Sequence, residues 1–179
     1  MKEERIILGS GILYVTEWTG GTLPGDSEIE VEDNKLGEIK GGASLVYTPT
    51  YYEPVADSGR IFRKLMTEEV AMLRTGIMTI NANMLDKLIS TGRLTETETM
   101  RTLKIGGPRN HRDIKYVVHF LHKDADYGDI RVTIVGSNNT GLEFAFAKNN
   151  ETIINAEFKA VPQDASGTLI LYKEEIPGD

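Results

Sequence analysis

The sequence predicts a mainly β protein, arranged as an antiparallel sandwich or a small barrel with one clear α-helix. Consecutive runs of alternating apolar and polar residues fill the second half of the chain, and turns rich in Gly, Asn and Pro separate them. A single segment near the middle places its apolar residues at the spacing of a helix. Alternating strands with short turns between them are typical of an antiparallel meander.

The predicted strands of the second half follow one another closely. They are residues 115–122, 129–136, 141–148, 151–161 and 167–175. Alternation in the second of these puts apolar and polar side chains on opposite faces: Ile130, Val132 and Ile134 on one, Arg131 and Thr133 on the other. Asn149-Asn150 separates two alternating runs and is typical of a tight hairpin turn. These patterns predict a sheet with one apolar face.

The predicted helix covers about residues 81–91. Met84 and Leu88 belong to an apolar stripe at helical spacing, Asn81 or Asn83 can cap its start, and Gly92 ends it.

The remaining segments of the first half are less regular. We expect a glycine-interrupted strand over residues 5–15 and another over 36–49. Residues 67–78 fit a helix or a strand by pattern alone. Residues 92–102 are polar and rich in Thr and Glu, which predicts a flexible loop.

Length and composition indicate one globular domain over residues 1–179. There is no cysteine and the net charge is −7 at pH 7, which argues against binding to a nucleic-acid backbone. An acidic wall could still line a passage for nucleic acid, because it repels phosphate. No apolar run is long enough to span a bilayer, and the start of the chain does not resemble a signal peptide.

We predict no catalytic, cofactor-binding or metal-binding residue and therefore no enzyme. His119 and His122 have opposite parity in a strand, so they cannot chelate one ion together. The glycine-rich loop 105–113 lacks the ending of a phosphate loop. It is either a plain exposed loop or a basic contact for an acidic partner through Arg109 and Arg112.

Four acidic residues alternate in the segment "DSEIEVED" (26–33). If the segment is extended, they lie on one face as an acidic patch: Asp26, Glu28, Glu30 and Glu32. Two interpretations stay open, a solvated edge that prevents unwanted pairing or a patch that meets a basic neighbour.

The most distinctive stretch is "GEIKGGASLVYTPTYYEP" (37–54), which combines glycines, an alternating strand, tyrosines and prolines. Gly41 and Gly42 allow a bulge or a close backbone approach. The alternating run offers edge hydrogen bonds to a neighbouring chain, and Pro49 and Pro54 limit where that pairing continues.

Several blocks in order resemble the tail tube (major tail) proteins of bacteriophages and prophages of Gram-positive bacteria. The blocks are "LGSGILYV", "GEIKGGASLVYTPTYYE", "GIMTINANMLDKL" and the end of the chain from "DIRVTIVG" to "TLILYKEEI". The similarity covers about residues 5–176. It implies a β-sandwich or half-barrel, the tail tube fold, with one flanking helix and a long β-hairpin arm.

The resemblance also implies a role. Such subunits form hexameric rings that stack into a hollow tube, and DNA passes through the lumen without specific binding. It implies the virion tail as the location, after assembly in the bacterial host cytoplasm. Tail initiator, terminator and length-determining proteins are the implied partners, with no cofactor and no membrane. A tail-like bacteriocin or a secretion tube would use a similar subunit.

By resemblance, residues 36–49 and 68–80 pair as the inner wall, which makes the second segment a strand. The connection between them, residues 50–66 within an arm over about residues 48–70, would reach the next ring. The predicted contact residues are Gly41, Gly42, Tyr47, Tyr51, Tyr52, Arg60, Arg63 and Lys64. The hypothesis is that the basic arm of one ring meets the acidic segment 26–33 of the next. The sequence does not decide which face lines the lumen, the one with Ser44, Val46 and Thr48 or the one with Leu45 and Tyr47.

Two other classes of function remain as alternatives. A non-catalytic carbohydrate-binding sandwich would need an exposed aromatic platform, and the lone Trp18 has no aromatic neighbour in the sequence. A small barrel enzyme would need a catalytic residue, and none can be nominated.

Overall fold

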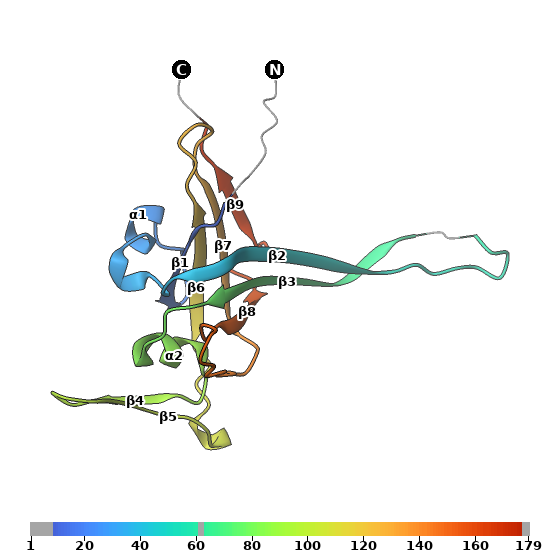
Figure 1. Ribbon diagram of the computed structural model, residues 1–179. Helices are drawn as coiled ribbons and strands as arrows, with labels where there is room; N and C mark the ends of the chain where they lie inside the picture. The colour runs from blue at the N-terminus through green and yellow to red at the C-terminus, as the bar shows by residue number, and fades with distance from the viewer. Residues whose placement is uncertain (1–8, 61–62, 177–179) are drawn as a thin grey trace.

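The computed structural model describes residues 9–60 and 63–176, which form a large antiparallel sheet with a long arm (Figure 1). Within these residues the sheet has seven strands in the order β1-β6-β7-β8-β3-β2, with β9 beside β7. Their bounds are β1 Ile12–Trp18, β2 Ile39–Tyr52, β3 Leu65–Ile77, β6 Lys115–His122, β7 Ile130–Asn138, β8 Ile154–Val161 and β9 Leu171–Glu174. The predicted mainly β, antiparallel fold is confirmed.

The smaller elements surround this sheet. A separate hairpin pairs β4 (Arg93–Glu96) with β5 (Arg101–Lys104). The helices are α1 (Asp26–Ile29) and α2 (Ala82–Leu88), with short 3-10 turns at Glu32–Asn34 and Pro108–Asn110. The sequence predicted α2 but not α1.

The sheet changes direction at β7. One edge of β7 pairs with β6, whereas the opposite edge is shared between β9 over residues 130–133 and β8 over residues 135–138. β8 then pairs with β3 over residues 154–159. Strands β2 and β3 therefore run across β6 and β7 instead of alongside them (Figure 1), as the right-handed twist of a sheet allows.

The main core lies on one face of the sheet, as alternation predicted. In β8, Ile154, Ala156 and Phe158 are buried and Asn155 and Lys159 are exposed. The buried residues of this core come mainly from α2 and from β1, β3, β6, β7 and β8, and Ile39 and Ala43 of β2 pack against it. Leu13, Leu73, Met84, Leu88, Val118 and Ile134 are among the buried residues.

The opposite face is also covered in part. Ile29 of α1 packs with Tyr14, Val117, Leu121 and Val135 in a second apolar cluster. The prediction of a single apolar face is therefore too simple, because a short helix far away in the sequence covers part of the polar face.

Helix α2 begins where predicted and ends earlier. The Asn81 side chain caps it by accepting a hydrogen bond from the Met84 backbone N–H at 2.8 Å. The helix ends at Leu88. The backbone carbonyls that follow the helix accept hydrogen bonds from Arg112. Its backbone N–H donates to the Ser90 carbonyl at 2.8 Å, and its guanidinium donates to the Ile89 carbonyl.

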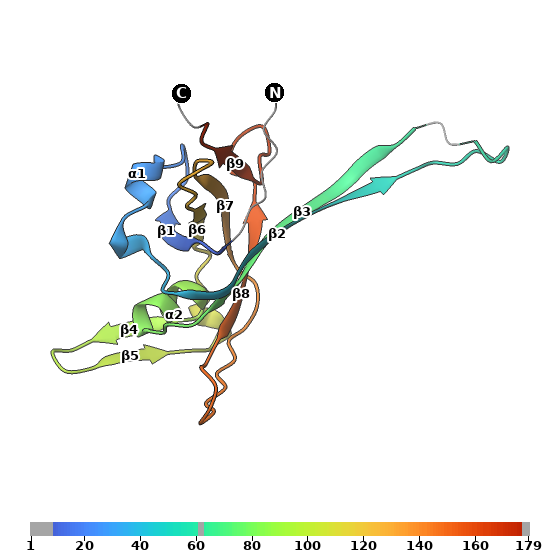
Figure 2. The same cartoon turned by 45° about the horizontal axis from the view of Figure 1, so that its top comes forward.

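The flexible loop predicted over residues 92–102 is instead the hairpin β4–β5, which extends away from the body (Figure 2). Cross-strand pairing stabilises it, with Arg101 Nε 2.9 Å from Glu96 Oε1. Thr97 closes its turn through hydrogen bonds with the backbone of Met100. Threonine-rich polar sequence favoured a strand here because β-branched residues fit a pleated ribbon.

The strand predicted over residues 141–148 does not form. This segment contains a single bridge, Ala147 to Asn150, and otherwise joins no ladder among the described residues. The turn lies at Lys148-Asn149, one residue before the predicted position. Phe144 and Phe146 remain exposed.

The first predicted strand is shorter than expected. Residues 5–8 lie outside the described residues, and β1 begins at Ile12, after the glycines. Gly11 passes so close to β6 that a Cβ there would lie 2.4 Å from the Leu121 carbonyl oxygen. The segment that was ambiguous by pattern, residues 67–78, is a strand: β3 contains it up to Ile77.

Candidate assembly surface

The hairpin β2–β3 forms an arm that extends far beyond the body of the molecule (Figures 1 and 2). β2 pairs with β3 along its length, and β8 pairs only with residues 72–77 of β3. Residues 65–71 of β3 therefore have a neighbour on one side only, and β2 is an edge strand of the sheet. The outer half of the arm is a two-stranded ribbon with two open edges.

The predicted connection over residues 50–66 is shorter than expected. β2 continues to Tyr52 and β3 begins at Leu65, so the strands extend into the predicted loop. Residues 61 and 62 lie outside the described residues.

Gly41 and Gly42 form the predicted bulge at the base of the arm. The register shifts between Lys40 and Ala43, and both glycines have positive φ, 80° and 74°. A close backbone approach does not explain them, because a Cβ at Gly41 would have no atom within 4 Å. Thr75 holds the bulge by donating its hydroxyl to the Gly42 carbonyl at 3.0 Å. The glycines are needed for their backbone conformation.

One side of the arm carries most of its large exposed apolar side chains, together with Glu69 opposite Pro49, and we call it the dry side. It continues the core face, because Leu45 pairs with buried Leu73 and Tyr47 with buried Ala71. Tyr51 pairs with Met66 farther out on the same side. The exposed fractions along the dry side are 40% for Leu45, 48% for Tyr47, 46% for Tyr51 and 52% for Met66. Such a row of exposed large apolar side chains is typical of a surface that a partner covers.

The other side of the arm mixes polar and apolar side chains, and we call it the wet side. On it, Ser44, Val46, Thr48 and Thr50 of β2 lie opposite Arg74, Met72, Val70 and Glu68 of β3. Arg74 forms an ion pair with Glu157 of β8 at 2.5 Å. The two sides match the two faces between which the sequence did not decide.

Two contacts brace the arm internally. The Tyr47 hydroxyl donates to Glu69 at 2.8 Å, and this bond to a carboxylate raises the pKa of Tyr47. The Lys64 ammonium lies 4.2 Å from the centre of the Tyr51 ring and 3.3 Å from Glu53. These contacts hold the tyrosines in place before any partner binds. Tyr52 lies on the wet side and is 58% exposed.

The tip of the arm contains the predicted basic residues. Arg60 and Arg63 are exposed, and the Arg60 carbonyl accepts the Ala56 N–H in the turn. Lys64 pairs with Glu53 across the strands, which offsets part of the positive charge predicted for the arm.

The predicted acidic patch over residues 26–33 is wrong. Residues Asp26–Ile29 are helical, so the carboxylates do not alternate along one extended face. Asp26 pairs with Lys173 at 2.7 Å, and Glu28 caps its own helix by accepting the Gly25 N–H. Acidic residues in a first helical turn are stabilised by the free N–H groups there, which favours helix over strand. Of the four, Glu28 and Glu32 are exposed, Glu28 in the helix and Glu32 in the following 3-10 turn.

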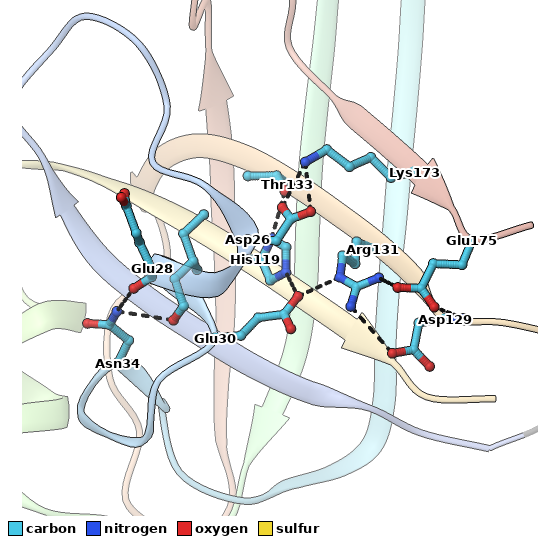
Figure 3. Close-up of polar contacts among 11 residues, drawn as sticks. Asp26, Glu28, Glu30, Asn34, His119, Asp129, Arg131, Thr133, Lys173 and Glu175 are labelled. Atoms are coloured by element: carbon cyan, nitrogen blue, oxygen red, sulfur yellow. Dashed lines mark hydrogen bonds and ion pairs between the residues drawn. The ribbon is translucent and has the colours of Figure 1, made fainter. Parts of the chain in front are cut away.

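Glu30 is the fourth of these acids and belongs to an internal charge network (Figure 3). Its Oε1 accepts from Arg131 Nε at 2.5 Å and lies 3.1 Å from His119 Nε2. Arg131 also donates to Glu175 at 2.6 Å. The network ties the end of α1 to strands β6 and β7 and to the segment after β9.

His119 is fully buried at the centre of this network. Its Nδ1 lies 2.8 Å from the Thr133 hydroxyl. Burial lowers the pKa of His119, while the hydrogen bond to Glu30 opposes that shift. The bonds to Glu30 and Glu175 raise the pKa of Arg131. His119 and Thr133 are both buried, and Glu30, His119 and Arg131 pair with one another or with neighbours, so the network holds these elements together as a structural clamp.

Sequence reasoning missed the roles of His119 and Arg131. It placed them in strands correctly but gave them no partner, because Glu30 is far away in the chain. Arg112 is likewise engaged internally, with Asp86 at 2.8 Å, which removes it as a contact for an acidic partner. Among the described residues, no group of three His, Asp or Glu side chains is arranged to hold a metal ion.

Comparison with known proteins leaves the family prediction untested. A scan against protein-family profiles and a search of curated protein sequences found no match to this chain. In the part of the chain that the structure describes, no helix is long and apolar enough to cross a membrane.

Proposed function

We propose that this chain is a structural virion protein that assembles with copies of itself into stacked hexameric rings, the hollow tail tube of a phage. The observation that carries the proposal is the arm, which presents an exposed dry side and open strand edges outside the body. The resemblance of its sequence blocks to tail tube proteins supplies the form of the assembly.

The arm is not expected to be stable in a protein that remains a monomer. A two-stranded ribbon is marginally stable in water, and open edges invite pairing with other chains. Charges and bulges limit the pairing of open edges with other chains but do not prevent it. The arm has both, with Arg60 and Arg63 at its tip and the bulge at Gly41 and Gly42. A second copy that covers the dry side would stabilise the arm and use its edge.

In the proposed tube, the arm of one copy meets a different surface of the next copy. Contacts of this head-to-tail kind close into rings or continue as filaments, whereas a self-complementary patch gives pairs. In the proposed tube, DNA passes through the lumen without specific binding, and the net charge of −7 keeps phosphate from adhering. Other tail proteins would start, measure and end the tube.

The experiment compares a variant substituted on the dry side of β2 with a control variant substituted on the wet side of the same strand. Tyr47→Ser with Tyr51→Ser should abolish large assemblies in sedimentation velocity, because the apolar contact area is lost. Thr48→Ala with Thr50→Ala should assemble like the unsubstituted chain, since those residues lie on the wet side. Thermal unfolding of the isolated subunits checks that both variants fold.

The proposal is contradicted if the dry-side variant assembles as well as its control. It is also contradicted if the unsubstituted chain sediments only as a subunit at high concentration.

A further inference from the structure

Residues 141–147 have the sequence of a strand but belong to no ladder. Leu142, Phe144 and Phe146 alternate with Glu143, Ala145 and Ala147. The Phe144 and Phe146 rings are parallel within 2° and their centres are 6.0 Å apart. An extended chain places alternate residues on one side about 6.6 Å apart. The segment is therefore already extended, with its two aromatic rings on the same side.

One edge of this segment faces its own chain. The Ala145 carbonyl accepts the Thr152 hydroxyl at 2.8 Å, and Ala147 forms a bridge with Asn150. In an antiparallel strand the N–H and C=O of one residue point the same way, and the next residue points the opposite way. The backbone groups of Phe144 and Phe146 therefore point to the free edge. The Phe146 side chain is 87% exposed.

We propose that residues 141–147 of one copy form a strand against the open edge of β2 in a second copy. This inference rests on the proposed self-assembly and names the two segments that meet. The patterns of the two strands agree, since residues 44–50 of β2 and residues 141–147 each carry their bulkier apolar side chains on one side and smaller or polar side chains on the other. Phe144 and Phe146 would continue the dry side of Leu45 and Tyr47, and Glu143 would lie beside Ser44 and Thr48 on the wet side.

Register favours this arrangement. A slip of one residue would move the phenylalanines to the wet side and Glu143 to the dry side, which costs apolar burial. The pairing thus has a defined set of registers, those that keep the two dry sides together.

The strand order explains why the partner is a second copy. Residues 141–147 connect β7 to β8, and β3 lies between β8 and β2. Within one chain the segment is separated from the open edge of β2 by β3. A neighbouring copy can bring its β2 edge to the segment, and repetition of that step links copies head to tail.

The absence of cysteine from the chain allows a direct test by disulfide cross-linking. Two singly substituted proteins are mixed, allowed to assemble and oxidised, and covalent dimers are identified by mass spectrometry. One protein carries Phe144→Cys or Phe146→Cys, and the other carries Leu45→Cys, Tyr47→Cys or Pro49→Cys. The matched controls carry Ser44→Cys or Thr48→Cys on the same strand.

We expect a covalent mixed dimer, at least tenfold above the controls, for at least one dry-side pair. The wet-side controls should give background, because side chains on opposite faces of a sheet cannot reach each other. Assembly without a dry-side cross-link above background overturns this inference and leaves the proposed function standing. Failure of the unsubstituted chain to associate overturns both.

If a cysteine variant does not assemble, hydrogen exchange of the unsubstituted protein tests the same pairing. The amides of Phe144 and Phe146 should exchange at least tenfold more slowly in the assembly than in the isolated subunit. Equal exchange rates at these two amides in a verified assembly would contradict the pairing.

Discussion

At the scale of single residues, Glu30 shows how one carboxylate joins segments that are far apart in the chain. It accepts hydrogen bonds from Arg131 and contacts His119, and Arg131 continues to Glu175 (Figure 3). Each partner satisfies a polar group that burial would otherwise leave unpaired. The result is a fixed position for α1 on the second face of the sheet.

His119 gives this clamp a pH dependence. Because burial lowers the pKa of His119 in the folded state, the unfolded chain binds a proton first as pH falls below about 6.5. We expect the free energy of unfolding to be highest above that pH and to fall between pH 6.5 and 5. Urea unfolding of the isolated subunit at several pH values measures it.

His119→Gln is the matched variant for this prediction. It replaces the imidazole with an amide that can hydrogen-bond but cannot titrate, so the free energy of unfolding of this variant should change less as the pH falls below 6.5. Partners lower the pKa of carboxylates such as Glu175 and Asp113, so their protonation lowers the free energy of unfolding only at more acidic pH than that of His119. Identical pH profiles for the two proteins would show that His119 does not titrate on unfolding.

At the scale of elements, the bulge at Gly41 and Gly42 links the body to the arm. Gly42→Ala should lower the free energy of unfolding by about 1–2 kcal/mol, because alanine resists the left-handed conformation that Gly42 adopts. Space is not the cause, since the nearest atom to an added Cβ is 4.0 Å away. Urea unfolding of the isolated subunit measures the change.

Gly141→Ala is the control for the bulge. Gly141 has no positive φ and an added Cβ would meet no atom within 4 Å, so the change should stay within about 0.5 kcal/mol. Equal stabilities for the two variants would contradict the conformational role of Gly42.

Local pattern predicted the elements whose neighbours lie in the same sheet. Strand β8 follows its alternation residue by residue, and α2 begins at the predicted Asn81 cap. Residues 26–33 were predicted wrongly because alternating acids favour neither state by themselves, and the helix forms through contacts with distant residues such as Arg131.

The candidate surface was predictable in part. The tyrosines and the glycine bulge stand out in the sequence, but the pairing of β2 with β3 came from the resemblance, since the pattern of residues 67–78 was ambiguous. The dry side required the register of the two strands, which places Tyr51 opposite Met66. The Glu30 network could not be read from the sequence, because its members are about a hundred residues apart.

At the scale of the whole molecule, two segments have strand edges without a partner strand among the described residues. The arm has an open edge and a dry side, and residues 141–147 form an extended segment with one free edge. Each segment could supply the neighbouring strand that the other lacks, and the strand order keeps the two apart within one chain. Assembly of copies in one direction satisfies both.

Electron microscopy of the purified, unsubstituted chain at increasing concentration tests the central claim most directly. The account predicts rings of uniform diameter and stacks of such rings with an open lumen. A field of single subunits at every concentration, confirmed as monomers by sedimentation, would contradict it.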